Sequence, residues 1–280
     1  MTTPTILSAA EFRKAPWRSL RSQEIKELAA LTFPEERQVA VWLAKEYYKG
    51  QGEIIDAGAF FGGSALTLAL GVRENASLQS ADKAGRVHSY DNFTWASWIR
   101  KDLQPPDVQF GTSFLNKFHD TIRKAEDAIV VYPGDITHRV WRGGPIELLF
   151  VDCAKTFAAN AAVIRIFFPH LIPGRAIVNQ QDFAIQSRLV WIHAAMEYFW
   201  DKFEELGSTI RGGTTLFRLT RAISAEECEA CVSALKGDCL TLAEKAARRF
   251  DAADRRHGNI LASIEAYQKS PLDLAEVCLP

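Results

Sequence analysis

The sequence predicts an α/β protein built on a doubly wound, mostly parallel sheet. From residue 53 onward, short apolar or β-branched segments alternate with segments of helical periodicity, as expected for parallel strands joined by helices. Several of these strand segments end in an acidic residue. The last two, at 202–206 and 214–220, are separated by a short glycine-containing stretch and indicate a closing hairpin. We therefore expect seven strands with helical extensions at both ends.

Size and composition exclude several classes of protein. A chain of 280 residues suffices for one large α/β domain or two small ones. The formal net charge of −1 lacks the basic surplus of a nucleic-acid-binding protein. No apolar run is long enough to predict a membrane span. The five cysteines and the absence of a signal-peptide pattern favour reduced thiols in the cytoplasm.

Residues 1–52 are predicted to form an N-terminal helical cap. A capping box, Thr32-x-x-Glu35, with Pro34 in the first turn, predicts a helix over 35–49. This helix leads into the core domain.

The stretch from Asp56 to Ser64 predicts a strand, a tight turn and a helix. Gly58 and Gly62 allow the backbone to approach a ligand closely, and the helix N-terminus offers free N–H groups. The D-x-G-x-x-x-G-G-S spacing differs from the G-x-G-x-x-G of nicotinamide and flavin binders. An ordinary strand-to-helix turn is the alternative. The strand and helix expected here cover residues 53–56 and 63–72.

Four further strands and three helices complete the predicted core, residues 53–221. The strands are expected at 85–91, 128–132, 146–152 and 175–179, and the helices at 114–125, 156–168 and 185–200. Ligands of parallel sheets bind beyond the carboxyl ends of the strands. Polar groups gather at those ends here, namely Asp56, Asp91, Asp135, Asp152 and the group Gln180-Gln181-Asp182.

Residues 222–280 are predicted to form a C-terminal helical appendage that covers the core, lids the site or builds a dimer. Ser224-x-x-Glu227 is a second capping box. The helix that follows is expected to stop near His257-Gly258, before a further short helix. Cys228-x-x-Cys231 lies in the first of these helices without a second pair at metal-site spacing, which favours structural thiols over a metal or redox site.

With these motifs in order, residues 53–220 resemble the class I S-adenosylmethionine-dependent methyltransferases, which have a seven-stranded Rossmann-like sheet. The segment 87–93 is similar to the acid-ended second strand of the macrocin O-methyltransferase type, and 146–182 follows that type's strand, helix and Leu-x-Pro-Gly turn. The resemblance implies S-adenosylmethionine as cofactor, bound by Asp56, Gly58, Gly62, Ser64, Asp91 and Asp135.

Within that resemblance, three aspartates have separate roles. Asp56 would lie near the methionine part of the cofactor, Asp91 would accept hydrogen bonds from both ribose hydroxyls, and Asp135 would contact the adenine amino group. A carboxylate suits the ribose because it accepts two donors at once. From the residues alone, a helix N-cap is the alternative for Asp91, and a turn aspartate is the alternative for Asp135.

The Asp152-x-x-Lys155 arrangement is similar to catechol O-methyltransferase, in which the aspartate binds magnesium and the lysine takes the proton from the substrate hydroxyl. Metal-dependent relatives have Asp-Asp or Asp-Asn at the end of the fifth strand, where this chain has Gln180-Gln181, followed by Asp182. Neutral oxygen ligands bind a hard dication more weakly than carboxylates.

Two kinds of site stay open. One is a Mg²⁺ site of Asp152, Gln181 and Asp182. The other is a metal-free site in which Gln180, Gln181 and Asp182 bind a polar substrate and Asp182 or a nearby histidine is the base. His138 follows the third strand and is a candidate substrate contact.

The predicted function is O-methylation of a small polar acceptor, such as a sugar hydroxyl, with homodimerisation through the helical ends as an expectation. A methyltransferase-like binding module without catalysis is the alternative. A nicotinamide-dependent oxidoreductase is disfavoured by the missing G-x-G-x-x-G and by the closing hairpin. Trp95, Trp98 and Trp141 either line an acceptor pocket or pack in the core.

Overall fold

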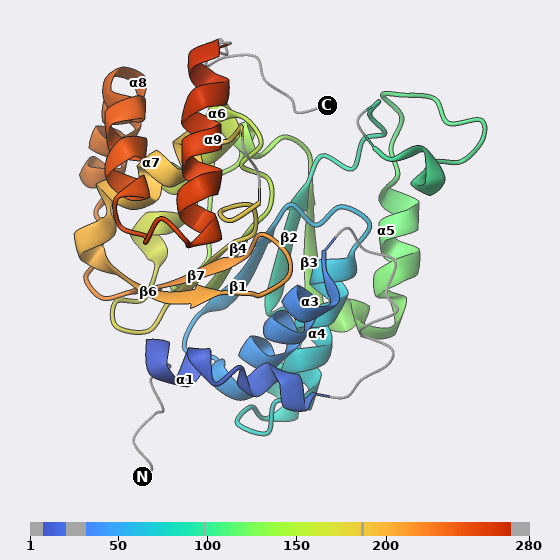
Figure 1. The fold of residues 1–280 in the computed structure, drawn as a ribbon. Helices are drawn as coiled ribbons and strands as arrows, with labels where there is room; N and C mark the ends of the chain where they lie inside the picture. Colours follow the sequence, from blue (N-terminus) through green and yellow to red (C-terminus); the bar gives the residue numbers. More distant parts are fainter. Residues whose placement is uncertain (1–7, 21–31, 98, 186–187, 270–280) are drawn as a thin grey trace.

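The computed structural model describes residues 8–20, 32–97, 99–185 and 188–269, and its centre is a seven-stranded sheet (Figure 1). The strand order is β3-β2-β1-β4-β5-β7-β6. β7 runs antiparallel to both of its neighbours, and the other pairs are parallel. The predicted sheet and its closing hairpin are confirmed. The strands are β1 Glu53–Ala57, β2 Val87–Asp91, β3 Ile129–Pro133, β4 Ile146–Val151, β5 Ile177–Gln180, β6 Phe203–Ser208 and β7 Thr215–Leu219.

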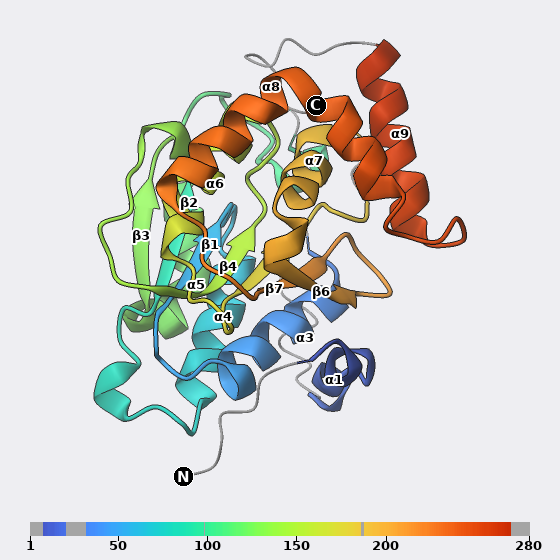
Figure 2. The ribbon, with the colours of Figure 1, turned by 90° about the vertical axis from the view of Figure 1, so that its left-hand side faces the viewer.

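Helices cover both faces of the sheet, and each face has its own hydrophobic cluster. In Figures 1 and 2, α3 and α4 lie on one side of the sheet and α6, α7 and α8 on the other. β4 is buried along its whole length, which explains why all of its residues except Glu147 are apolar. The helices are α1 Ala9–Arg13, α3 Pro34–Trp42, α4 Gly63–Glu74, α5 Leu115–Ile122, α6 Phe157–Phe167, α7 Val190–Tyr198, α8 Ala225–Ala247 and α9 Arg255–Lys269.

The capping box predicted at Thr32 and Glu35 is wrong by one residue. α3 begins at Pro34, and the carboxylate of Glu36 accepts the N–H of Phe33 at 2.8 Å. Glu35 instead accepts backbone N–H groups from Ile210 and Arg211. The helix therefore starts where Glu36, rather than Glu35, can accept the backbone N–H of the N-cap residue Phe33.

A buried ion pair joins the end of the N-terminal helical segment to the sheet. Glu147 of β4 is fully buried and accepts Arg175 Nε at 2.7 Å. Its carboxylate also accepts the backbone N–H groups of Lys49 and Gln51. The hydroxyl of Tyr47 donates to the carbonyl oxygen of Arg175 at 2.5 Å, so the same pair fixes the chain just before β1.

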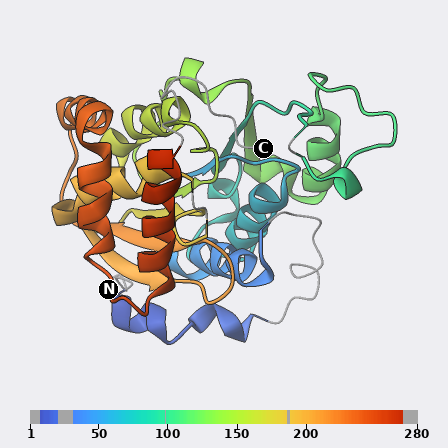
Figure 3. The ribbon, with the colours of Figure 1, turned by 45° about the horizontal axis from the view of Figure 1, so that its top comes forward.

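The N-terminal α1 packs against the edge strand β6, and both lie at one side of the molecule in Figure 3. Gly207 in β6 makes this contact possible. A Cβ atom at this position would lie 2.7 Å from Cδ1 of Phe12.

The C-terminal segment consists of two helices, and the predicted stop near His257-Gly258 is wrong. The Ser224–Glu227 capping box is confirmed, but α8 ends at Ala247. The carboxylate of Asp254 accepts the N–H of Arg256 at 2.8 Å at the start of α9. His257 and Gly258 therefore lie inside α9 rather than at the end of a helix. None of the described helices has the length and apolar character needed to cross a membrane.

The cysteines of α8 point into the cluster shared by α6, α7 and α8. Cys228 and Cys231 are buried there, and the four described cysteines are all free thiols. Their environment fits the predicted structural role.

Candidate active site

The turn after β1 brings the backbones of two strand ends into contact. Gly58 has φ +111°, and a Cβ atom there would lie 2.6 Å from the carbonyl carbon of Asp152, so a larger residue has no room. Just before it, the buried carboxylate of Asp56 accepts hydrogen bonds from the hydroxyls of Ser64 at 3.0 Å and Ser89 at 3.3 Å. Burial raises the pKa of Asp56 to about 7.

Gly62 ends this turn and begins the next helix. It is the N-cap of α4 with φ +90°, and no side chain caps the helix there. The predicted glycine turn into a helix N-terminus is therefore present, with Ser64 in the first turn beside Asp56.

Asp91 at the end of β2 holds the two loops that follow β1 and β2. Its carboxylate accepts the N–H of Phe60 at 2.9 Å and that of Phe93 at 2.7 Å. Both phenylalanines have positive φ, at 45° and 50°, a strained conformation that clusters at functional sites. The next α-helix starts only at Leu115, so the helix N-cap interpretation of Asp91 is wrong. Each carboxylate oxygen keeps a lone pair for a ligand hydroxyl, and burial raises the Asp91 pKa.

Asp135 and His138 follow β3 in a single 3-10 turn, η6 (Ile136–His138). The exposed carboxylate of Asp135 accepts the N–H and the hydroxyl of Thr137, both at 2.8 Å, as a turn aspartate does. His138 is exposed. β3 lies four strand positions from β5, or about 19 Å. The structure thus does not bring His138 together with the glutamines at the end of β5.

Lys155 links the carboxylates at the ends of β4 and β5. Its ammonium nitrogen lies 2.6 Å from Oδ1 of Asp152 and also donates to Oδ2 of Asp182. Burial acts to lower the Lys155 pKa, but the two carboxylates together outweigh it and raise the pKa. Burial raises the pKa of Asp182 to about 6 against the attraction of Lys155. Lys155 is a cation in this arrangement, without a lone pair to serve as a base.

The two predicted glutamine contacts have separate environments. The side chain of Gln180 is buried, with Nε2 4.0 Å from Sδ of Met196 in α7. Gln181 Oε1 accepts the hydroxyl of Thr214 at 3.0 Å, and its side chain lines the pocket described below.

A Mg²⁺ site does not fit the arrangement of Asp152, Gln181 and Asp182. The described residues contain no group of three acidic, histidine or cysteine side chains able to hold a metal ion. The two aspartates are already paired with Lys155.

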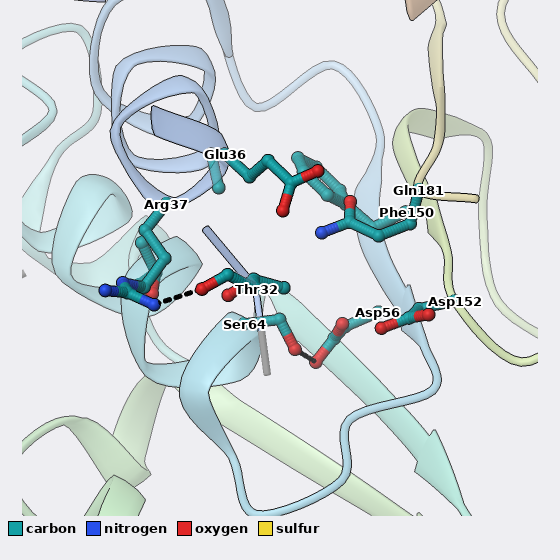
Figure 4. Close-up of a pocket in the computed structure, with 10 residues that line it drawn as sticks. Thr32, Glu36, Arg37, Asp56, Ser64, Phe150, Asp152 and Gln181 are labelled. Carbon is teal, nitrogen blue, oxygen red and sulfur yellow. Dashed lines mark hydrogen bonds between the residues drawn. The ribbon is translucent and has the colours of Figure 1, made fainter. Parts of the chain in front are cut away.

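A pocket of about 330 Å³, counting the space open to solvent, lies between α3, α4 and the carboxyl ends of the strands. Figure 4 shows Asp56 and Ser64 on one side of it, and Glu36 facing Gln181 on the other. Glu36 and Arg37 line this pocket but were not predicted from the sequence. No motif in the sequence indicates that α3 packs at the carboxyl ends of the strands. The pocket is lined by Thr32, Glu36, Arg37, Ala40, Asp56, Ser64, Thr67, Phe150, Asp152 and Gln181.

Glu36 connects α3 to the loop between β6 and β7. Its buried carboxylate accepts the N–H of Gly213 at 2.8 Å, and the N–H and hydroxyl of Thr214 at 3.1 and 3.0 Å. The same loop is held a second time by Arg255 of α9, which donates to the carbonyl oxygens of Thr209 and Ile210. The loop at residues 209–214 is therefore held by the N-terminal and the C-terminal helices at once.

The tryptophans belong to the core rather than to the pocket. Trp95 packs against Phe61 and Phe114, and Trp141 donates its indole N–H to the carbonyl oxygen of Gly144 at 2.8 Å. Neither lines the pocket. Trp98 lies outside the described residues.

No family model and no curated protein sequence matches the chain. Among solved structures, it is similar to the calicheamicin methyltransferase CalS11, with 16% identity over 75% of this chain and 93% of that one and a TM-score of 0.47. It is also similar to an O-methyltransferase from Bacillus cereus, with 12% identity over 77% of this chain and 98% of that one and a TM-score of 0.45. The strand order, with β7 antiparallel between β5 and β6, is itself the fold of the class I methyltransferases.

Proposed function

We propose that the protein transfers a methyl group from S-adenosylmethionine to a hydroxyl of a small polar acceptor such as a sugar. One observation carries the proposal. Asp91 and the Asp56–Ser64 turn lie at the carboxyl ends of neighbouring strands, and Asp56 and Ser64 line a pocket together with Asp152 and Gln181. S-adenosylmethionine supplies an activated methyl group on its sulfonium when bound.

The residues present fit this cofactor. The free lone pairs of Asp91 suit two ribose hydroxyls, because its carboxylate is fixed by two backbone N–H groups. Asp56 lines the pocket and offers a negative charge to the ammonium group of the methionine part. The exposed carboxylate of Asp135 is available to the adenine amino group.

On the acceptor side, we assign proton removal to Asp152. Its side chain is 32% exposed and lines the pocket, whereas Asp182 is only 7% exposed behind it. The protonated Lys155 orients both carboxylates and balances their charge, so the site needs no metal ion. Gln181, fixed by Thr214, is the amide that hydrogen-bonds the acceptor.

The first test is calorimetric titration of the whole chain with S-adenosylhomocysteine. We expect micromolar binding that is lost in Asp91→Ala. Absence of binding to the wild type would overturn the proposal, and binding of NADH in its place would indicate an oxidoreductase.

Turnover then separates an enzyme from a binding module. We expect formation of S-adenosylhomocysteine with a polar hydroxyl acceptor, and a large decrease in Asp152→Asn. Binding without turnover across an acceptor panel would favour the non-catalytic alternative. Homodimerisation and a cytoplasmic location stay predictions from the sequence.

A further inference from the structure

The geometry points to Arg139 as a residue that contacts the adenine base of the cofactor, an assignment that rests on the proposed function. Arg139 directly follows the 3-10 turn η6 at the end of β3. Its guanidinium lies against the backbone of Gly134, where a Cβ atom would be 2.3 Å from Nη2 and 3.3 Å from Cζ of Arg139.

This position is at the nucleoside end of the site. Gly134 precedes Asp135, and its N–H donates to the carbonyl oxygen of Asp91 at 2.8 Å. The guanidinium therefore lies beside the strand ends to which the proposal assigns the ribose and the adenine.

The guanidinium has no hydrogen bond or ion pair within the part of the chain that the structure describes. Its Nε atom is buried without a partner. Arg218 and Arg256 are also partly buried, but each of them pairs with a carboxylate. A buried donor without a partner costs free energy that a ligand acceptor would recover.

The chemistry of the surroundings favours a neutral base over an anion. Asp91 ends β2 and Asp135 follows β3, so an anion bound at these two strand ends would meet two carboxylates against one arginine. A planar guanidinium stacks on an aromatic face, and its edge donates to ring nitrogens. Adenine offers both a face and such acceptors.

The test uses two ligands that share adenosine but differ in the amino-acid part, 5′-methylthioadenosine and S-adenosylhomocysteine. In calorimetric titration, we expect Arg139→Ala to decrease the affinity for both ligands by about tenfold. Arg139→Lys should restore only part of the lost affinity. Asp56→Asn should give the opposite pattern. It should decrease the affinity for S-adenosylhomocysteine alone, because 5′-methylthioadenosine lacks the ammonium group assigned to Asp56. Arg142→Ala, at an exposed arginine three residues on, is the matched control and should change neither affinity.

Thermal unfolding of each variant separates lost contacts from lost structure. Unchanged affinities in a folded Arg139→Ala protein would overturn the assignment, as would weaker binding of S-adenosylhomocysteine alone. Wild-type binding of inorganic phosphate that disappears in Arg139→Ala would also overturn it, in favour of an anion site. If the wild type binds neither adenosine ligand, the proposed function itself fails.

Discussion

The ammonium group of Lys155 is held by the buried carboxylate of Asp182, 27 residues further along the chain at the end of the neighbouring strand. The pairing places a fixed positive charge between two carboxylates, where a divalent cation would otherwise compete for the same oxygens. Lys155 is thereby a positioning residue for Asp152 and Asp182.

Removing this charge should expose a latent metal site. In Lys155→Ala, Asp152 and Asp182 lose their shared cation, so we expect Mg²⁺ to bind at millimolar concentrations, whereas the wild type shows no binding in the same calorimetric titration. We also expect a decrease in methyl transfer of about 100-fold, because the carboxylates lose their orientation.

Lys155→Arg is the control, since it keeps a cation and should bind no Mg²⁺. Equal Mg²⁺ binding by the wild type and Lys155→Ala would contradict the role assigned to Lys155.

The raised pKa of Asp56 predicts a pH-dependent stability. The folded-state pKa of about 7 lies above the ordinary value of 3.8, so the folded protein holds this proton more tightly than the unfolded chain does. The resulting stabilisation is complete below pH 3.8 and is lost as the pH rises to about 7. The loss amounts to at most ~4 kcal/mol.

Asp56→Asn should remove this dependence. We expect the variant to be more stable than the wild type at pH 8 in urea unfolding, with a flatter profile between pH 4 and 7. An unchanged profile would show that Asp56 is not the group responsible. In the wild type, affinity for S-adenosylhomocysteine should rise with pH up to about 7, because the ligand ammonium favours the ionised carboxylate.

Gly212 is predicted to be intolerant of a side chain. It has φ +101°, and a Cβ atom would lie 2.3 Å from Oε1 of Glu36. Gly212→Ala should therefore decrease the free energy of unfolding by about 2 kcal/mol and weaken cofactor binding by moving α3. The control is Gly237→Ala in α8, where nothing lies within 4 Å of the new atom. That substitution should be neutral or stabilising by up to ~1 kcal/mol, and a similar loss in both variants would refute the steric argument.

The buried pair of Glu147 and Arg175 predicts a large loss of stability on disruption. Arg175→Met leaves the fully buried Glu147 carboxylate without its cation, so we expect a loss of about 3–5 kcal/mol in the free energy of unfolding. Arg221→Met breaks an ion pair with Asp201 whose side chains are 61% and 66% exposed, and it should cost less than ~1 kcal/mol. Comparable losses in the two variants, measured by denaturant unfolding, would contradict this account.

The sheet and its polar edge could be predicted from the sequence because they depend on local patterns. An apolar run ending in an acid and a glycine, as at Asp56 and Gly58, indicates both a strand and its carboxyl end. The separate environments of Gln180 and Gln181 were not predicted, because Gln180 ends β5 and packs against Met196 of α7, whereas Gln181 follows the strand and contacts Thr214.

Other parts of the site depend on contacts across the fold. Both Glu35 and Glu36 could cap α3, and the loop at 209–214 decides between them through hydrogen bonds to residues more than 170 positions away. The sequence placed Lys155 beside Asp152, but only the pairing of β4 with β5 brings Asp182 to the same nitrogen.

The attachment of the β6–β7 loop to both ends of the chain limits how the protein can be cut or recombined. Glu36 holds this loop from the N-terminal side and Arg255 from the C-terminal side. A fragment trimmed to the sheet and its intervening helices would lose both attachments. Replacing this loop with that of another protein of the same fold would likewise require α3 and α9 to be replaced with it, so the three segments can be exchanged only together.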